Sequence, residues 1–157
     1  VCYGGMDAVA GPMIRQMKQL GITAKFMGGD GICSGELPKL AAGTMADGQV
    51  VCAEAGGVEG NQKVAMEKFK ADFKKKFNAD VQIYAPYVYD ATMVMVDAVV
   101  KAGSAEPAKY LPVLAKTNGY KGVTGTISFD EKGDIKNGAL TLFTYKGDKR
   151  EQIAVVR

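Results

Sequence analysis

Two short stretches decide the fold of this chain: VCYGGMD at residues 1–7 and FMGGDG at residues 26–31. In each, the apolar residues of a predicted strand run into a pair of glycines that turns the chain. A helix is predicted between them over residues 7–20, because its apolar residues repeat at helical spacing and Gly21 can end it. A second, short helix leads to a third predicted strand at residues 49–53. This alternation predicts an α/β fold in which helices flank a parallel sheet.

The rest of the chain divides into three further segments. Residues 54–60 are rich in glycine and have no regular period, so we interpret them as a hinge. Residues 61–122 carry predicted helices at 61–77, 84–102 and 106–116, and the second is apolar nearly all round, which predicts burial on several sides. Residues 123–157 alternate as strands and are predicted to end in a β-hairpin closed by the turn at 146–148.

Composition removes several classes of function. The 157 residues include no histidine, so histidine metal ligands, Ser-His-Asp triads and Cys-His dyads are excluded within this chain. The net charge of +3 does not predict nucleic-acid binding, and we interpret the basic run Lys74–Lys76 as a solvated helix face. The longest apolar stretch, residues 84–100, contains Asp90 and Asp97 and is too short to span a membrane. We expect no cofactor and no nucleic-acid partner.

Three cysteines, Cys2, Cys33 and Cys52, allow at most one internal disulfide. The chain has no C-x-x-C motif, so neither a zinc ribbon nor a thioredoxin-like site is predicted. Two interpretations stay open. The cysteines are three small buried residues, or Cys33 and Cys52 form a disulfide, since both follow or lie within predicted strands of one α/β unit. An oxidising compartment would permit that bond.

The two glycine-rich turns are the candidate ligand sites. Both follow strands, but neither matches a nucleotide-binding motif, and Asp7 and Asp30 would repel a phosphate. Ligands of open α/β sheets bind beyond the carboxyl ends of the strands, where both aspartates are expected. Asp7 has a second interpretation as a helix cap, whereas Asp30 has no such structural duty and suits an ammonium group. A pair of acid/base carboxylates in an enzyme domain remains a weaker alternative, because no nucleophile lies beside them.

Five motifs together resemble a known family: YGGMD at 3–7, GPMIRQMKQLG at 11–21, FMGGDG at 26–31, APYVYDA at 85–91 and GTISFDEKGD at 125–134. In order and spacing they resemble the branched-chain amino acid binding proteins of bacterial ABC transport systems. The resemblance covers essentially the whole chain. It implies a type I periplasmic binding fold, in which two α/β lobes hold an amino acid between them.

The resemblance also implies a set of ligand-binding residues. An acidic residue at the position of Asp30 holds the α-ammonium group in the family, and an aromatic at the position of Tyr87 lines the side-chain pocket. We place Gly29, in the same loop as Asp30, in the predicted site. The family has an aromatic contact near Met6, where this sequence has Met6 and Asp7. That departure leaves room for a polar or different amino acid, with Asp7 reaching the ligand.

The resemblance covers only the C-terminal part of the family, so we expect a fragment whose N-terminal half is missing. On this map residues 1–53 belong to the second lobe, 54–60 form a hinge, and 61–122 belong to the first lobe. Which of the two lobes contains residues 123–157 is left undecided by the resemblance. Helices without their sheet should expose apolar faces that include Phe69, Phe73 and Phe77, which makes a homodimer possible.

The function implied by the resemblance is that of a non-enzymatic, periplasmic solute-binding protein. Its expected partners are an amino acid, branched-chain or similar, and the membrane permease subunits of an ABC importer. Cleft closure about the hinge would hold the ligand. The alternative is the same fold used as a sensory or receptor module, which a fused signalling segment would distinguish.

Overall fold

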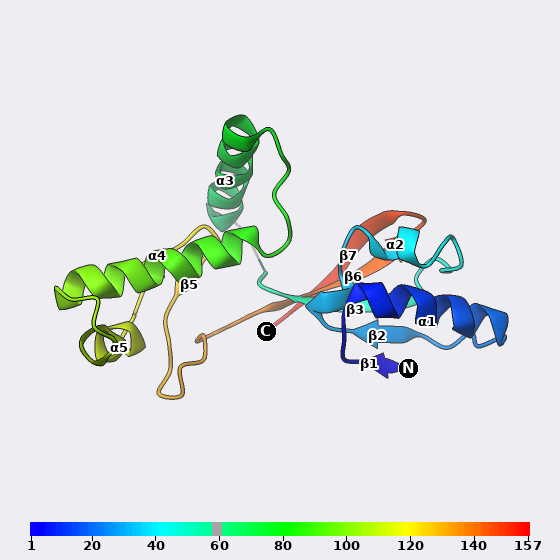
Figure 1. The fold of residues 1–157 in the computed structure, drawn as a ribbon, viewed down its shortest axis with the longest axis horizontal. Coiled ribbons are helices and arrows are strands. Elements are labelled where there is room, and N and C mark those ends of the chain that lie inside the picture. The colour runs from blue at the N-terminus through cyan, green and yellow to red at the C-terminus, as the bar shows by residue number, and fades with distance from the viewer. Residues whose placement is uncertain (58–60) are drawn as a thin grey trace. The chain divides into compact units, whose positions relative to one another are not determined.

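A computed structural model describes residues 1–57 and 61–157 of the chain, which form two compact units. The sheet unit comprises Val1–Gly57 and Gly138–Arg157, and the helical unit comprises Val58–Asn137, of which residues 61–137 are described. Figure 1 shows that the chain leaves the sheet unit after β3, runs through the helical unit and returns as β6 and β7.

The sheet unit contains a five-stranded mixed sheet in the order β1-β2-β3-β6-β7. The predicted parallel arrangement is confirmed for the first three strands, and the C-terminal hairpin joins the same sheet in the antiparallel sense. Cys52 of β3 pairs with Gly28 on one side and with Phe143 on the other. The strands are β1 (Cys2–Tyr3), β2 (Phe26–Gly28), β3 (Val50–Ala55), β6 (Leu140–Lys146) and β7 (Lys149–Val156).

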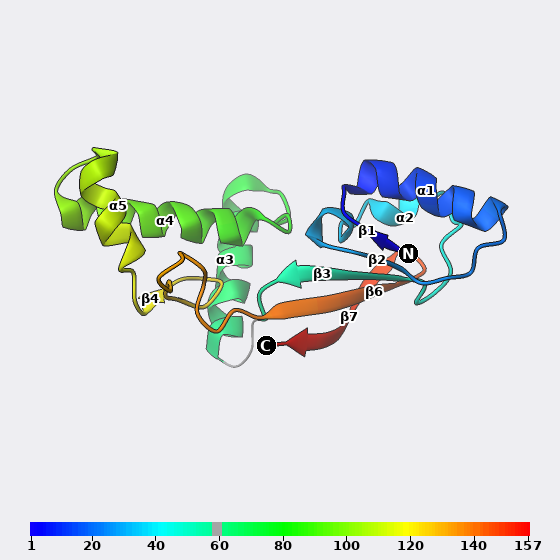
Figure 2. The same cartoon turned by 90° about the horizontal axis from the view of Figure 1, so that it is seen from below.

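Helices of the sheet unit lie over one face of the sheet (Figure 2). They are α1 (Asp7–Gln19), the single 3-10 turn η1 (Asp30–Ile32) and α2 (Leu37–Leu40). Gly11 lets α1 approach α2, because a Cβ at this position would lie 2.5 Å from the Cβ of Leu40. The start of α1 differs from the predicted cap: Met6 is the N-cap residue and Asp7 is the first residue of the helix.

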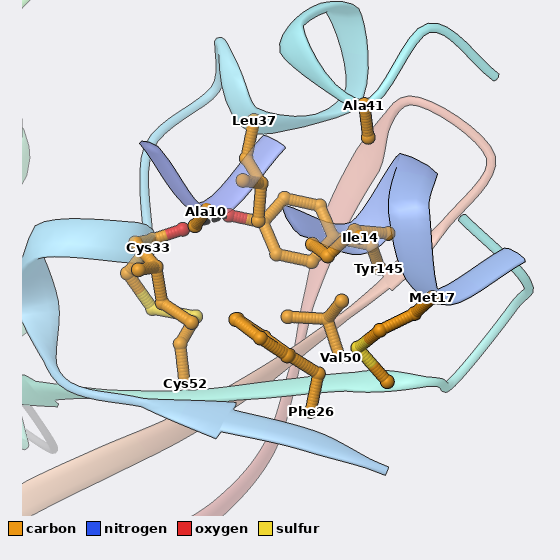
Figure 3. Packing of buried hydrophobic residues seen from close by; sticks show 11 residues of the cluster. Ala10, Ile14, Met17, Phe26, Cys33, Leu37, Ala41, Val50, Cys52 and Tyr145 are labelled. Carbon is orange, nitrogen blue, oxygen red and sulfur yellow. Dashed lines mark hydrogen bonds between the residues drawn. A yellow bond between two sulfur atoms is a disulfide. The ribbon is translucent and has the colours of Figure 1, made fainter. Parts of the chain in front are cut away.

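The core of the sheet unit lies between this sheet face and the helices (Figure 3). Side chains alternate across β3, so Val50 and Cys52 are buried under the helices. Met27 of β2 is exposed, and within the described residues of the sheet unit the helices lie on one face of the sheet. The buried cluster also contains Ala10, Ile14, Met17, Phe26, Ile32, Cys33, Leu37, Ala41 and Tyr145.

Cys33 and Cys52 form a disulfide with their Cα atoms 5.5 Å apart. The bond joins the residue that follows η1 to the middle of β3 and lies inside the core (Figure 3). Of the two interpretations of the cysteines, the structure therefore supports the disulfide. Cys2 is a free thiol and is exposed, so the expectation of three buried cysteines is wrong for this residue.

The helical unit is built from α3 (Asn61–Phe77), α4 (Ala85–Ala102) and α5 (Pro107–Ala115), with a short antiparallel pair of β4 (Tyr120–Lys121) and β5 (Thr126–Ile127). Gly103 ends α4 in a left-handed conformation, with φ of 62°, as its position predicted. The loop between β4 and β5 is tied to α4 by Asp90. This buried carboxylate accepts hydrogen bonds from the backbone N–H groups of Val123 and Thr124 at 2.9 and 2.7 Å.

The apolar sides of α3 and α4 are only partly covered. The rings of Phe69, Phe73 and Phe77 contact one another at tilted angles along α3, with centroids 6.2 and 4.8 Å apart. Phe77 is exposed as expected, whereas Phe69 and Phe73 are half-buried because each packs against a neighbouring ring. On α4, Val94 and Ala98 are buried, but other apolar side chains face outward, so burial on several sides is not achieved within the described residues. No helix in the described part of the chain is long and apolar enough to cross a membrane.

Two predicted boundaries bear on the hinge and the hairpin. Strand β3 continues through Glu54 and Ala55, so the predicted hinge overlaps the strand by two residues, and its residues 58–60 lie outside the described part of the chain. The hairpin of β6 and β7, whose lobe the sequence left open, belongs to the sheet unit through its pairing with β3.

Candidate functional site

The two glycine-rich turns meet at the carboxyl edge of the sheet. They follow β1 and β2, which are neighbouring parallel strands, so both turns leave the sheet at the same edge. A Cβ on Gly31 would lie 2.7 Å from the carbonyl oxygen of Gly5 and 2.8 Å from Sδ of Met6, so only a glycine fits between them. The sheet topology therefore brings Met6, Asp7, Gly29 and Asp30 together, as the sequence predicted for the edge.

Asp30 presents its carboxylate to solvent at this edge. It is the first residue of η1, directly after the exposed Gly29. None of the described residues donates a hydrogen bond to its carboxylate oxygens. The group is therefore available to accept hydrogen bonds from a bound cation, which are stronger than hydrogen bonds between neutral groups.

Asp7, by contrast, is engaged within the chain. Its Oδ1 accepts a hydrogen bond of 2.8 Å from the backbone N–H of Ala8, and its Oδ2 accepts one from the hydroxyl of Ser34. These bonds tie the start of α1 to the segment after η1. The contact of Asp7 with a ligand stays a prediction, while its contact with Ser34 gives it a structural role.

Glu54, near the carboxyl end of β3, and Arg150 of β7 form a partly buried ion pair. The Arg150 guanidinium donates to Oε1 of Glu54 and lies 4.3 Å from the centroid of the Phe143 ring. Burial raises the pKa of the Glu54 carboxyl, and the opposing attraction of Arg150 is the smaller effect. The negative charge of Asp30 also raises the pKa of Glu54, which places the two carboxyl groups within electrostatic reach of each other.

Tyr87 lies in the helical unit, in the first turns of α4, and is half-buried. It belongs to a different unit from Asp30 and Met6, so its role in the ligand site stays a prediction. The neighbouring aromatic Tyr89 packs against Phe69 of α3 with ring centroids 5.2 Å apart. Tyr89 therefore contributes to packing within the helical unit.

Sequence reasoning missed Glu54, Arg150 and Tyr145 as neighbours of the site. Glu54 was assigned to the hinge, and the two hairpin residues lie more than 110 positions after the turn that they contact. No local motif marks such contacts. Within the described ranges there is also no group of three His, Cys, Asp or Glu side chains that could hold a metal ion.

Comparison with known proteins identifies the family. The model of a family described as periplasmic binding protein matches residues 1–150. The chain belongs to this family. The periplasmic binding protein relatives include a leucine-, isoleucine-, valine-, threonine- and alanine-binding protein of Pseudomonas aeruginosa, which is 33% identical over 94% of this chain. Leu/Ile/Val-binding protein homolog 1 of Brucella abortus is 34% identical over 93% of the chain.

Solved structures of periplasmic binding proteins share the fold. A leucine-binding protein from Thermotoga maritima superposes with a TM-score of 0.80 at 26% identity and covers 99% of this chain. The branched-chain amino acid transporter substrate-binding protein of Streptococcus pneumoniae, solved with isoleucine, gives a TM-score of 0.74 at 23% identity over the same share. This chain spans 38% of the length of the two curated relatives and 43% of the two solved chains.

Proposed function

We propose that this chain carries part of the binding site of a solute-binding protein that delivers an amino acid, branched-chain or similar, to an ABC permease. The exposed Asp30 carboxylate, which accepts no hydrogen bond from the described residues, carries this proposal. It lies beyond the carboxyl ends of parallel strands, where α/β proteins of this architecture bind their ligands. Asp30 accepts hydrogen bonds from the α-ammonium group of the amino acid.

The other site residues surround that contact. Gly29 brings the backbone close to the ligand, Met6 provides an exposed apolar surface beside it, and Tyr87 lines the pocket for the ligand side chain. The names of the Pseudomonas and Brucella relatives support a branched-chain or similar uncharged amino acid as the ligand. The name of the Streptococcus pneumoniae neighbour, a branched-chain amino acid transporter substrate-binding protein, favours transport over the sensory alternative.

Because the chain spans only 38% of the length of its curated relatives, the proposal includes parts of the protein outside these residues. A segment outside these residues supplies the rest of the binding cleft, including the groups that hold the ligand carboxylate. The protein works in the periplasm, and closure about residues 54–60 traps the amino acid. The closed form then docks on the membrane subunits of the importer.

The proposal is tested by calorimetric titration of the full-length polypeptide with L-leucine, L-isoleucine, L-valine, L-threonine and L-alanine. Because a hydrogen bond to a charged group contributes about 1.5–3 kcal/mol, Asp30→Asn should weaken binding of the best ligand by about 10- to 100-fold. The substitution keeps the size of the side chain, removes its charge and replaces one acceptor oxygen by an NH2 group.

Asp148→Asn is the matched control. Asp148 is an exposed aspartate in the β6–β7 turn, at the end of the sheet opposite to Asp30. This variant should bind as tightly as the wild type. An Asp30→Asn variant of unchanged affinity would remove Asp30 from the site, and a wild type that binds none of the five amino acids would reject the ligand class.

A further inference from the structure

Three consecutive carbonyl groups follow Asp30 in the chain and all accept hydrogen bonds from the C-terminal hairpin. The buried hydroxyl of Tyr145 on β6 lies 3.1 Å from the carbonyl oxygen of Ile32 and 2.8 Å from that of Ser34. Between them, Nη1 of Arg150 on β7 donates to the carbonyl oxygen of Cys33 at 2.6 Å. Figure 3 shows Tyr145 inside the core, with its hydroxyl directed at this segment.

The same segment is held from two further directions. The disulfide joins Cys33 to β3, and the Ser34 hydroxyl donates to Asp7 at the start of α1. Arg150 is itself held in place by Glu54 and by the ring of Phe143. Residues 32–34 are therefore attached to α1, β3, β6 and β7, whereas Asp30 at the start of η1 is exposed.

We propose that Tyr145 and Arg150 are positioning residues that hold the η1 turn so that Asp30 meets the ligand in one orientation. This inference rests on the proposed function of Asp30. Binding is strengthened when a group is held in its bound conformation beforehand, because less freedom is lost on association. A short turn that follows the exposed Gly29 would otherwise sample several conformations.

The surroundings of Arg150 and Tyr145 favour a positioning role over direct contact with the ligand. Arg150 is a cation whose charge faces Glu54 and the Cys33 carbonyl, and the Tyr145 hydroxyl is buried and directed at backbone oxygens. The pKa of Tyr145 is raised by burial, so its hydroxyl stays protonated and remains a donor at neutral pH. Both side chains therefore donate to backbone carbonyl groups of residues 32–34.

The test is a double-mutant cycle measured by calorimetric titration of the full-length polypeptide with L-leucine. Tyr145→Phe removes one hydroxyl and keeps the ring, so it should weaken binding by about 2- to 10-fold, the range of one neutral hydrogen bond. Arg150→Met should weaken binding similarly, and Arg150→Lys should recover part of the loss. In an Asp30→Asn background both losses should shrink toward none, because residues that act through one group are not additive.

Hydrogen exchange of the Cys33 amide, which donates to the Asp30 carbonyl at 2.9 Å, reports on the turn without any ligand. Exchange should become faster in Tyr145→Phe and Arg150→Met than in Arg15→Met, which changes an exposed arginine of α1. Unchanged exchange would overturn the proposal, as would losses of affinity that simply add to that of Asp30→Asn.

If Asp30→Asn itself binds L-leucine normally, the proposed function fails and the positioning role falls with it. Hydrogen exchange separates this failure from a failure of the positioning contacts. If only the role of Asp30 is wrong, the Cys33 amide still exchanges faster in Tyr145→Phe and Arg150→Met; if the contacts do not hold the turn, its exchange is unchanged. If Tyr145→Phe does not fold, Arg150→Met supplies the measurement, since Arg150 is only partly buried.

Discussion

At the carboxyl edge of the sheet, burial and the neighbouring Arg150 shift the pKa of the Glu54 carboxyl group in opposite directions. Its side chain is 15% exposed, and removal from water disfavours the ionised form. Arg150 favours that form but is the smaller effect, so the pKa of Glu54 is raised above the ordinary carboxyl value of 4.5. The folded state therefore binds a proton at Glu54 more tightly than the unfolded chain does, and acid favours folding at this one group.

This direction gives a pH dependence that can be measured. Glu54→Gln removes the titration, so the free energy of unfolding of the wild type minus that of the variant should increase as pH falls from 7 toward 4.5. Urea titrations of the full-length polypeptide at several pH values test this, with Glu36→Gln on the exposed Glu36–Lys39 pair as control. A difference that decreases over that window would mean that the attraction of Arg150 outweighs burial.

At the scale of elements, the disulfide is the covalent link between η1 and β3. It joins residues 19 positions apart, so it restricts a loop of moderate length in the unfolded chain. In the folded chain it lies beside the hydrogen bonds from Tyr145 and Arg150 to the same segment. The link therefore stabilises the part of the sheet unit that carries Asp30.

Replacing both cysteines, as Cys33→Ala with Cys52→Ala, should lower the free energy of unfolding by about 3 kcal/mol, the value expected for a loop of this size. Urea denaturation of the full-length polypeptide measures the loss, and the wild type in reductant should show a similar one. Cys2→Ala, at an exposed free thiol, should leave stability within about 0.5 kcal/mol. Equal stability of the double variant and the wild type would contradict this prediction, because the disulfide would then contribute nothing to the free energy of unfolding.

At the scale of the whole molecule, apolar surface is left uncovered in both units. Met27 is exposed on one face of the sheet, and Val88 and Val100 of α4 are 61% and 72% exposed. The chain spans only 38% of the length of its Pseudomonas relative. We expect the segment that completes the cleft to cover these surfaces, and exposed apolar surfaces of this kind associate when nothing covers them.

The 157-residue chain by itself should therefore self-associate at micromolar concentration, whereas the full-length polypeptide should not. Val88→Lys combined with Val100→Lys should shift the 157-residue chain toward monomer in sedimentation velocity, because a charge on each exposed position opposes apolar contact. Leu20→Lys makes the same kind of change at a residue that is 74% exposed at the end of α1, and should leave association unchanged. A monomeric wild-type chain would contradict the prediction.

Local patterns were sufficient for much of the fold and for one site residue. The spacing of Met66, Phe69, Phe73 and Phe77 predicted α3 with the bounds that the structure has, because helical periodicity is a property of neighbouring residues. The glycines around Asp30 predicted a turn at a strand end, and η1 begins there. These features depend on residues only a few positions apart.

Long-range packing decided the rest. The contacts of Tyr145 and Arg150 with residues 32–34 cross more than 110 positions, and the choice of Cys33 and Cys52 as the bonded pair depends on which strands become neighbours. The sequence offered Asp7 either as a helix cap or as a ligand contact, and only the fold shows that the Ser34 hydroxyl lies within hydrogen-bonding distance of it. The physical reason is that a periodic pattern specifies which face of an element is apolar, while the partners of each side chain follow from how the elements pack.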